Sequence, residues 1–385
     1  MTYKVRYIDL PEQYRRLENE IIAAVKEVLR SGSFILRDQV WQFEESMASF
    51  LGADYVVGVN SGTDALYLAL RAAELGPGDE IITVSHTFVA TVAVIVHCGA
   101  SPVLVDVRED FNMDVEQLEQ AISHRTRAIL PVHLNGRLCD MEKLLAVAQT
   151  HNLLVIEDAA QALGASLEGK KAGTFGLAGC FSLHPMKNLG GAGDGGFVAT
   201  QNSKLAEKLR LLRNHGQRTK EDLPCFGFNS RLDNLQAAIL NVKLKSLPEW
   251  IERRRQVASL YHQGLSNLPF LQLPPPPQQH GRFFDIYSSY VIRAQERDRL
   301  VTHLGECGIE TFIHWPKPLH HQEALGLGHF QLPKTEEFAK EVVSLPISAE
   351  ISNEQVEFVI DSIRNFYMKR VPVEELPSLC SREKS

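Results

Sequence analysis

Short runs of apolar residues alternate with helical patterns through the first half of the chain. Seven runs are rich in β-branched and aromatic residues and have the length of buried strands, at residues 55–59, 81–84, 102–107, 128–134, 153–159, 180–183 and 196–200. Between the first five lie stretches with apolar residues at helical spacing. This alternation predicts an α/β fold with a mostly parallel seven-stranded sheet covered by helices on both faces. The last two runs follow each other closely, so they are expected to pair as neighbours or to include an antiparallel strand.

A second region follows with a different pattern. Long helical stretches fill residues 231–265, and the run Pro274–Pro277 then interrupts the chain. Strand-like and helical stretches beyond the prolines predict a smaller C-terminal α+β domain. We therefore expect a large domain over residues 1–250, which includes an N-terminal helical segment, a small domain over 251–370, and a disordered polar tail over 371–385.

Composition and charge exclude several classes of partner. The formal net charge is −7, so no bulk basic surface is available for nucleic acid. No apolar run reaches the length of a membrane span, and the polar N-terminus does not resemble a signal peptide. The six cysteines are scattered without a CxxC pair, which is typical of reduced thiols. We expect a cytoplasmic protein with no nucleic-acid and no membrane partner.

The segment VGVNSGTDAL (57–66) reads as a strand that passes directly into a helix. Ser61 is a good N-cap, and Gly62 would let a ligand approach the backbone closely. The free N–H groups and the dipole at such a helix start favour an anion such as phosphate. An ordinary capped helix explains the same residues equally well.

The segment VIEDAAQALGA (155–165) ends a buried strand with Glu157 and Asp158. Ligands of open α/β sheets gather at the carboxyl edge, where these carboxylates are expected. An acidic residue there suits a ribose, a metal or a protonated ring nitrogen. Alternatively, Asp158 caps a helix over AAQALGA.

One lysine stands out in SLHPMKNLGGAGDGG (182–196). Lys187 follows an apolar strand and precedes a glycine-rich stretch, which favours an inward-pointing amine. A desolvated lysine is a candidate Schiff-base nucleophile or general base. An anion site, a strand-end carboxylate and such a lysine together point to pyridoxal 5'-phosphate, whose phosphate, ring nitrogen and aldehyde each need one of them.

The chain resembles the DegT/DnrJ/EryC1/StrS family of nucleotide-sugar aminotransferases, which are fold-type I PLP enzymes. The resemblance runs from about Ile8 to about Tyr367. It is carried by SGTDALYLAL, SHTFVAT, GASPVLVDV, VIEDAAQALGA, the lysine segment, RNHG, FNSRLDNLQAAIL and IETFIHWPKPLH.

The resemblance implies a role for each matching residue at the cofactor. Lys187 would bond to the cofactor aldehyde, and Asp158 would pair with the pyridine nitrogen. Gln161, one helical turn after Asp158, would lie near the 3-hydroxyl, and Phe88 would stack on the ring. The cofactor phosphate would be bound by three residues of this chain and one of a neighbouring subunit, so a homodimer with shared active sites is expected. These residues are Gly62, Thr63 and Ser182, with Asn229 from the neighbour.

The resemblance also implies the reaction. An amino acid, usually L-glutamate in similar enzymes, gives its amine to the cofactor and leaves as 2-oxoglutarate. A keto group on a nucleotide-linked sugar then takes the amine. The run NLGGAGDGG is closer to relatives that aminate C3 than to those that aminate C4, so a 3-keto (6-deoxy)hexose is the expected acceptor.

Several residues are expected on the substrate side: Asn135, His184, Arg231 and His314. Two of them depart from the family pattern, because His184 and Asn135 stand where relatives often have tyrosine. Arg37 replaces a common glycine and lies either near the sugar or on the surface. His314, His320 and His321 lack the Cys, Asp or Glu spacing of a metal site, so no metal is predicted.

Three alternatives remain open: a 4-keto-sugar aminotransferase, a PLP-dependent sugar dehydratase and a catalytically silent regulatory homologue. Related dehydratases replace the lysine with histidine, so Lys187 counts against that activity. The presence of both Lys187 and Asp158 counts against a silent homologue.

Overall fold

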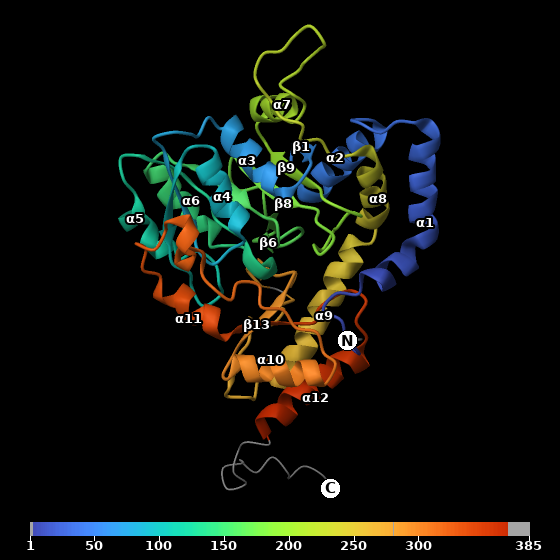
Figure 1. The fold of residues 1–385 in the computed structure, drawn as a ribbon, viewed down its shortest axis with the longest axis vertical. Coiled ribbons are helices and arrows are strands. Elements are labelled where there is room, and N and C mark those ends of the chain that lie inside the picture. Colours follow the sequence, from blue (N-terminus) through green and yellow to red (C-terminus); the bar gives the residue numbers. More distant parts are fainter. Residues whose placement is uncertain (1–2, 280, 369–385) are drawn as a thin grey trace.

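The computed structural model describes residues 3–279 and 281–368. It shows a larger body built on one wide sheet and a smaller body below it, with the long helix α9 (Leu247–Leu265) running from one to the other (Figure 1). Position 250 falls inside α9, so the division of the chain at 250–251 stays a prediction. The expected tail over 371–385 lies outside the described residues.

Seven strands form the sheet of the larger body in the order β1-β9-β8-β5-β4-β2-β3. They are β1 (Tyr55–Val59), β2 (Glu80–Val84), β3 (Ser101–Val105), β4 (Thr126–Ile129), β5 (Leu154–Asp158), β8 (Ala178–Ser182) and β9 (Gly196–Thr200). The pairs from β3 to β8 are parallel, whereas β9 runs antiparallel to both β8 and β1. The predicted mostly parallel sheet is confirmed, and so is the pairing of its last two runs.

Helices cover both faces of this sheet because each carries an apolar stripe that must be buried. One core lies under α2 (Asp38–Leu51), α6 (Met141–Thr150) and α8 (Asn234–Leu244). The opposite core lies under α3 (Gly62–Ala72), α4 (Val89–His97) and α7 (Ser203–Leu212). Helix α1 (Leu10–Ser31) packs outside, against α8, and the short α5 (Leu118–Ala121) follows β3.

The smaller body has its own core around an antiparallel sheet. Its strands are β10 (Leu271–Gln272), β12 (Tyr290–Ala294) and β13 (Val342–Leu345). Helices α9, α10 (Arg297–Glu306) and α12 (Asn353–Met368) contribute to that core, and so does Val5 from the N-terminal segment. Helix α11 (Pro333–Glu341) precedes β13, and a small sheet joins β6 (Ser166–Leu167), β7 (Lys170–Lys171) and β11 (Phe283–Phe284). Among the described residues, no helix combines the length and apolarity needed to cross a membrane.

The helix considered over AAQALGA is wrong. Residues 159–165 form successive tight turns, in which the N–H of Ala162 donates to the carbonyl of Ala159 (2.9 Å) and the N–H of Ala165 to that of Ala162 (3.0 Å). Gly164 adopts a φ of +100°, and a Cβ there would lie 2.5 Å from Ile251 Cδ1. The chain therefore turns under α9, and Gln161 lies in a turn and not one helical turn after Asp158.

Candidate active site

One cleft at the carboxyl edge of the sheet collects most of the predicted site residues. Its lining comes from the start of α3, the segment after β2, the end of β5 and the segment after β8. It includes Gly62, Thr63, Phe88, Asp158, Gln161, Ser182, His184 and Lys187. An adjoining pocket shares Gln161, Ser182, His184 and Lys187 and extends to Tyr7, Ser289 and His314. Segments far apart in sequence thus form one site.

The start of α3 forms the anion-binding end of this cleft. Ser61 caps the helix, with its Oγ accepting the N–H of Asp64 at 3.0 Å. The predicted N-cap is confirmed. Gly62 lies so close to Ser182 that an added Cβ would be 2.7 Å from its Cβ atom. A side chain at position 62 would therefore collide with Ser182, and glycine there lets the start of α3 lie directly against the end of β8.

Asp158 ends β5 and is buried at the base of the cleft, only 5% exposed. Thr91 Oγ1 donates to its Oδ2 at 2.8 Å, and the N–H of Ala160 donates to its Oδ1 at 3.2 Å. Burial raises the pKa of Asp158, and the charge of Lys187 opposes that effect. No helix follows this residue, so its carboxylate does not serve as a helix cap.

Lys187 is half-buried and lies in a turn in which its N–H donates to the carbonyl of His184 at 2.8 Å. Burial lowers the pKa of the amine, while the carboxylate of Asp158 raises it. Helix α8 braces the glycine-rich segment behind it, because Lys243 Nζ donates to the carbonyl of Gly190 at 2.7 Å and Gln236 Oε1 accepts the N–H of Ala192 at 2.8 Å. The amine is thus held beside Asp158 on a supported turn.

Glu157 does not share the cleft with Asp158. Its carboxylate is fully buried and accepts four hydrogen bonds: from His133 Nε2 (2.9 Å) and from the N–H groups of Gly173 (2.7 Å), Phe175 (2.8 Å) and Gly176 (2.7 Å). Neighbouring residues of a strand point to opposite faces, so only one of the two carboxylates can face the cleft. Glu157 anchors the turn before β8.

Replacing Glu157 with glutamine should destabilise the fold by about 2–4 kcal/mol, because the new NH2 group faces donors that the carboxylate accepted. Urea denaturation of the two proteins measures the difference. The exposed Glu142→Gln variant is the control and should match the wild type. Equal stability of Glu157→Gln and wild type would show that the four bonds do not anchor the turn.

Phe88 and Gln161 both line the cleft, Phe88 with an exposed ring and Gln161 with a hydrogen-bonded amide. The Phe88 side chain is 62% exposed just before α4, where an apolar ring is available to a ligand. Gln161 Oε1 accepts the N–H of Asn135 at 2.9 Å, and Asn135 adopts a φ of +57°. Asn135 itself lines a separate pocket with Arg137 and Tyr287. Its proposed contact with substrate stays a prediction.

Three predicted residues lie away from the cleft of their own chain. Asn229 is exposed on the loop between α7 and α8 that projects from the body (Figure 1), where it pairs with Asn214. Arg231 donates to Asn214 Oδ1 at 3.1 Å. Arg37 is exposed at the start of α2. Asn229 was expected to act from a neighbouring subunit, and its exposure is compatible with that role.

Sequence reasoning missed residues that long-range folding brings to the cleft. Tyr7 lies in the adjoining pocket, 3.3 Å from Ser289 Oγ through its hydroxyl, although 282 positions separate the two residues. His314, which the sequence did predict on the substrate side, lines the same pocket, and its Nδ1 lies 2.9 Å from Ser344 Oγ. Burial, and to a smaller extent the charge of Lys187, lowers the pKa of His314 from 6.5 to about 4. Thr91 could have been found from the sequence, because it lies three residues after Phe88 in the same segment, SHTFVAT.

His86, two residues before Phe88, is buried in an aromatic cluster with Phe111, Trp315 and Phe338. Burial lowers its pKa from 6.5 to about 4. Between pH 6.5 and about pH 4 the folded state therefore binds fewer protons at His86 than the unfolded state does. The free energy of unfolding falls as the pH falls through this range.

A His86→Phe variant should be less acid-sensitive than the wild type. Between pH 7 and pH 5 the wild type should lose about 2 kcal/mol more of its unfolding free energy than the variant. Denaturation at both pH values measures this, with the exposed His124→Phe as control. Equal losses in wild type and His86→Phe would refute the assignment.

The fold and the cleft together define the class of protein. A buried strand-end carboxylate, a lysine of lowered pKa and an open helix start are the three groups that pyridoxal 5'-phosphate requires, and they converge here. The sequence matches the DegT/DnrJ/EryC1/StrS aminotransferase family over residues 15–364. The chain belongs to this family of PLP-dependent aminotransferases.

Individual relatives differ in the role that their names give. The chain is 44% identical to a pleiotropic regulatory protein of Geobacillus stearothermophilus, covering 94% of this chain and 98% of that protein. It is 42% identical to the dTDP-3-amino-3,4,6-trideoxy-alpha-D-glucose transaminase of Streptomyces venezuelae, covering 95% and 97%. The solved S. venezuelae DesV structure superposes with a TM-score of 0.91 at 41% identity, covering 96% of this chain and all of that one.

Proposed function

We propose that this protein transfers the amino group of an amino acid, L-glutamate in the simplest case, to a keto carbon of a nucleotide-linked sugar. The observation that carries the proposal is the convergence of Asp158, Lys187 and the start of α3 in one cleft of a family aminotransferase. A cleft used only for binding would not need a buried carboxylate and a desolvated amine side by side.

The residues of the cleft fit the cofactor group by group. Gly62, Thr63 and Ser182 would hold the phosphate, Phe88 would cover the ring, and Gln161 would lie near the 3-hydroxyl. Asp158 would keep the ring nitrogen protonated. Burial raises the pKa of this carboxyl group, and a cationic ring nitrogen beside it would favour its charged form. When bound, the cofactor supplies an electron sink for the carbon that loses its proton.

Lys187 has two tasks in this proposal. Its amine would bind the cofactor aldehyde, which its lowered pKa favours because a neutral amine is the nucleophile. Released from that bond, the same Nζ would move the proton between the substrate carbon and C4' of the cofactor. The supported turn and the nearby Asp158 keep the amine in place for both tasks.

In this proposal the amino group is placed at C3 of the sugar. One relative is named as a 3-amino-sugar transaminase, which supports the C3 assignment made from NLGGAGDGG. His184 is exposed in the cleft and lines both pockets, so it is positioned to contact the acceptor, with His314 across the adjoining pocket. Arg231 and Asn135 complete the proposed substrate set.

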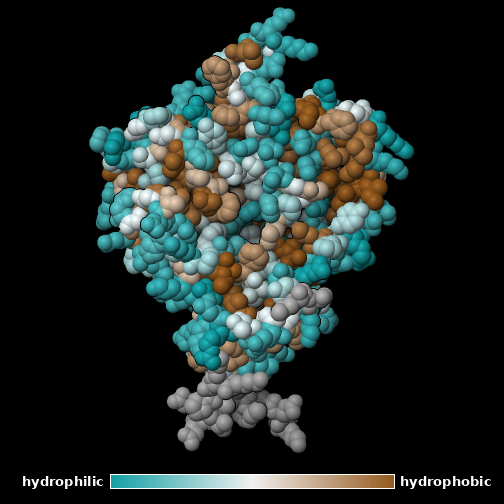
Figure 2. Space-filling model, viewed as in Figure 1, coloured by the Kyte–Doolittle hydropathy of each residue, from teal (hydrophilic) through white to brown (hydrophobic). Residues whose placement is uncertain are grey.

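The active unit in this proposal is a homodimer. A concentrated apolar area covers the region of α1 and α2 (Figure 2), and large apolar side chains there are exposed: Leu29, Phe34, Ile35 and Trp41. Burial of such an area is favourable in a subunit interface. The exposed Asn229 on the projecting loop would then reach the cleft of the partner subunit.

Complementation tests the shared site. Lys187→Ala and Asn229→Asp subunits carrying different tags are co-expressed, and the doubly tagged dimer is purified. Asn229→Asp alone should lower activity about 10-fold or more, because a second negative charge faces the phosphate. The mixed dimer should recover about half of the wild-type activity, since one of its two sites combines Lys187 with an intact Asn229.

If Asn229 serves its own chain, the mixed dimer has no complete site and keeps only the residual activity of one Asn229→Asp site. A double variant carrying both changes in one chain, mixed with wild-type chains, is the matched control. It should give no complete site if Asn229 is shared between subunits, and one working site if Asn229 serves its own chain.

A keto-sugar screen tests the function itself. The protein is first treated with L-glutamate, and release of 2-oxoglutarate is measured. It is then offered dTDP- and UDP-linked 3-keto and 4-keto sugars, and the aminated products are identified by mass spectrometry and NMR. Amination at C3 is expected. Amination at C4, loss of water without amine transfer, or no response to glutamate would favour the 4-keto enzyme, the dehydratase or the silent homologue respectively.

A further inference from the structure

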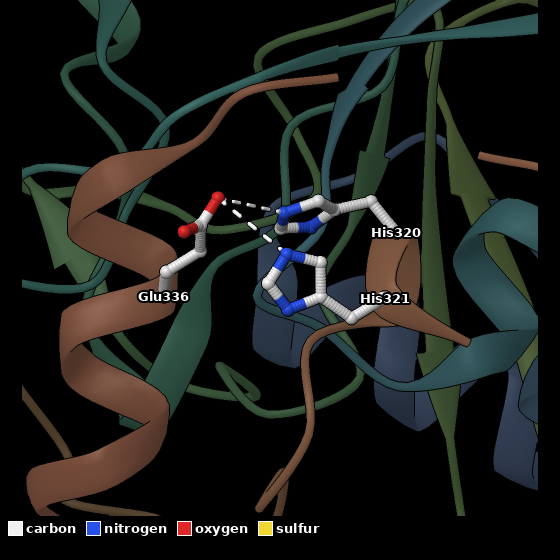
Figure 3. A group of neighbouring side chains, drawn as sticks. All are labelled: His320, His321 and Glu336. Atoms are coloured by element: carbon white, nitrogen blue, oxygen red, sulfur yellow. Dashed lines mark hydrogen bonds and ion pairs between the residues drawn. The ribbon is translucent and has the colours of Figure 1, made fainter. Parts of the chain in front are cut away.

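Two histidines and a glutamate bring three ligand atoms together beside the region after β2 (Figure 3). His320 Nε2 lies 3.3 Å and His321 Nε2 lies 3.6 Å from the same oxygen, Glu336 Oε1. All three ligand atoms lie within 4.8 Å of one another. The histidines belong to the short helix Leu319–His321, and Glu336 belongs to the first turn of α11.

The His320–Glu336 contact is a long hydrogen bond, and both separations are also close to those between ligands of one metal ion. A charge-assisted N–H···O bond is usually about 2.7–2.9 Å long, and both observed distances are longer. A tetrahedral zinc ion with bonds of about 2.0–2.1 Å separates its ligand atoms by about 3.3–3.4 Å. The His320 separation of 3.3 Å equals such an edge, and the His321 separation of 3.6 Å is slightly longer than one.

Surrounding hydrogen bonds hold the ligands in this arrangement. His320 Nδ1 lies 2.8 Å from Ser85 Oγ, and the backbone N–H of His320 donates to the same oxygen at 3.2 Å. This contact at Nδ1 leaves Nε2 directed at Glu336. Metal-binding histidines are typically fixed in this way through their second nitrogen.

The other side of the group is fixed through Asp106. Its Oδ1 accepts the N–H and the hydroxyl of Thr335 (2.9 and 2.7 Å), and its Oδ2 accepts the N–H of Lys334 (2.8 Å). These bonds set the first turn of α11, which carries Glu336. Both halves of the group are therefore positioned before any ion binds.

Exposure leaves room for the ion and for water. The His320 side chain is fully buried, whereas those of Glu336 and His321 are 34% and 44% exposed. The open side can admit an ion and a fourth, water ligand. Two imidazoles and one carboxylate favour zinc, cobalt or nickel over magnesium or calcium, which prefer oxygen ligands alone.

We propose that His320, His321 and Glu336 bind one divalent transition-metal ion, with zinc as the best match. The sequence predicts no metal because Glu336 lies 15 positions beyond His321, outside any familiar ligand spacing, and only the fold brings it there. The ion would join the Leu319–His321 helix to α11 and, through Ser85, to the strand that leads into Phe88. The proposal does not depend on the sugar substrate.

Zinc binding to the full-length, cofactor-loaded protein tests this. The protein is dialysed against EDTA and then against metal-free buffer, and ZnCl2 is titrated in by calorimetry. We expect one ion per chain and a rise in the unfolding temperature on binding. His321→Ala and Glu336→Gln should each weaken zinc binding at least 10-fold. The exposed His124→Ala variant is the matched control and should bind as the wild type does.

The variants also distinguish the proposed site from another possible zinc site. Cys307 Sγ and His303 Nε2 lie 3.8 Å apart and form another candidate pair of zinc ligands. The proposal is overturned if Cys307→Ser removes the binding and His321→Ala does not. It is equally overturned if the wild type binds no zinc, or if both ligand variants bind with unchanged affinity.

Discussion

Replacing Lys187 with alanine is expected to lower the rate of amino transfer by about 10⁴-fold, because general acid–base catalysis alone contributes roughly 10²–10⁴-fold and covalent capture of the cofactor is lost as well. The measurement is single-turnover release of 2-oxoglutarate from L-glutamate. Lys187→Arg is the matched control. It keeps a positive charge beside Asp158 but has no amine that can bond to an aldehyde, so it should be folded and equally inactive.

Two other lysines allow a test of whether Lys187 is the residue that bonds to the cofactor. Burial also lowers the pKa of Lys171 and of Lys243. Each of them, however, donates to a backbone carbonyl, that of Phe50 or of Gly190, whereas Lys187 lines the cleft. Borohydride makes a bond between an amine and the cofactor aldehyde permanent, so peptide mapping should find the label on Lys187. A label on Lys171 or Lys243, or an active Lys187→Arg variant, would contradict the assignment.

Local signals in the sequence predicted much of the fold and of the site. The strand runs match because each is short, apolar and bounded by polar residues, which leaves few alternatives to a buried sheet. Ser61 could be assigned as a cap because capping depends on residues within one turn. The placement of Asp158 and Lys187 in one cleft followed from their positions at the ends of strands that the fold makes parallel neighbours.

Other features depend on contacts that no local pattern carries. The turns after Asp158 form because Gly164 packs beneath Ile251 from a distant helix. The approach of Tyr7 to Ser289, and of Glu336 to the two histidines, needs the whole chain to fold first. The orientation of Glu157 was available in principle, because strand alternation already placed it opposite Asp158.

Replacing Asp158 with asparagine is expected to separate activity from stability. Activity should fall by roughly 10²–10³-fold, the scale of losing one preorganised electrostatic contact, because a neutral amide cannot keep the ring nitrogen protonated. Stability of the cofactor-free protein should not fall. Burial raises the pKa of Asp158, so the folded state holds its proton to higher pH than the unfolded state does. Stability is therefore lost as the pH rises through that range, and asparagine removes this loss.

The Thr91→Val variant is the control for this comparison. It removes the hydroxyl that donates to Asp158 Oδ2 at 2.8 Å but leaves the carboxylate in place. Its activity should fall less than that of Asp158→Asn, because one hydrogen bond is lost while the charge that pairs with the ring nitrogen stays. Half-reaction rates and unfolding curves at pH 6 and pH 8 measure both variants. If Asp158→Asn loses stability together with activity, Asp158 is a structural residue. If it keeps the wild-type rate, the ring nitrogen has another partner.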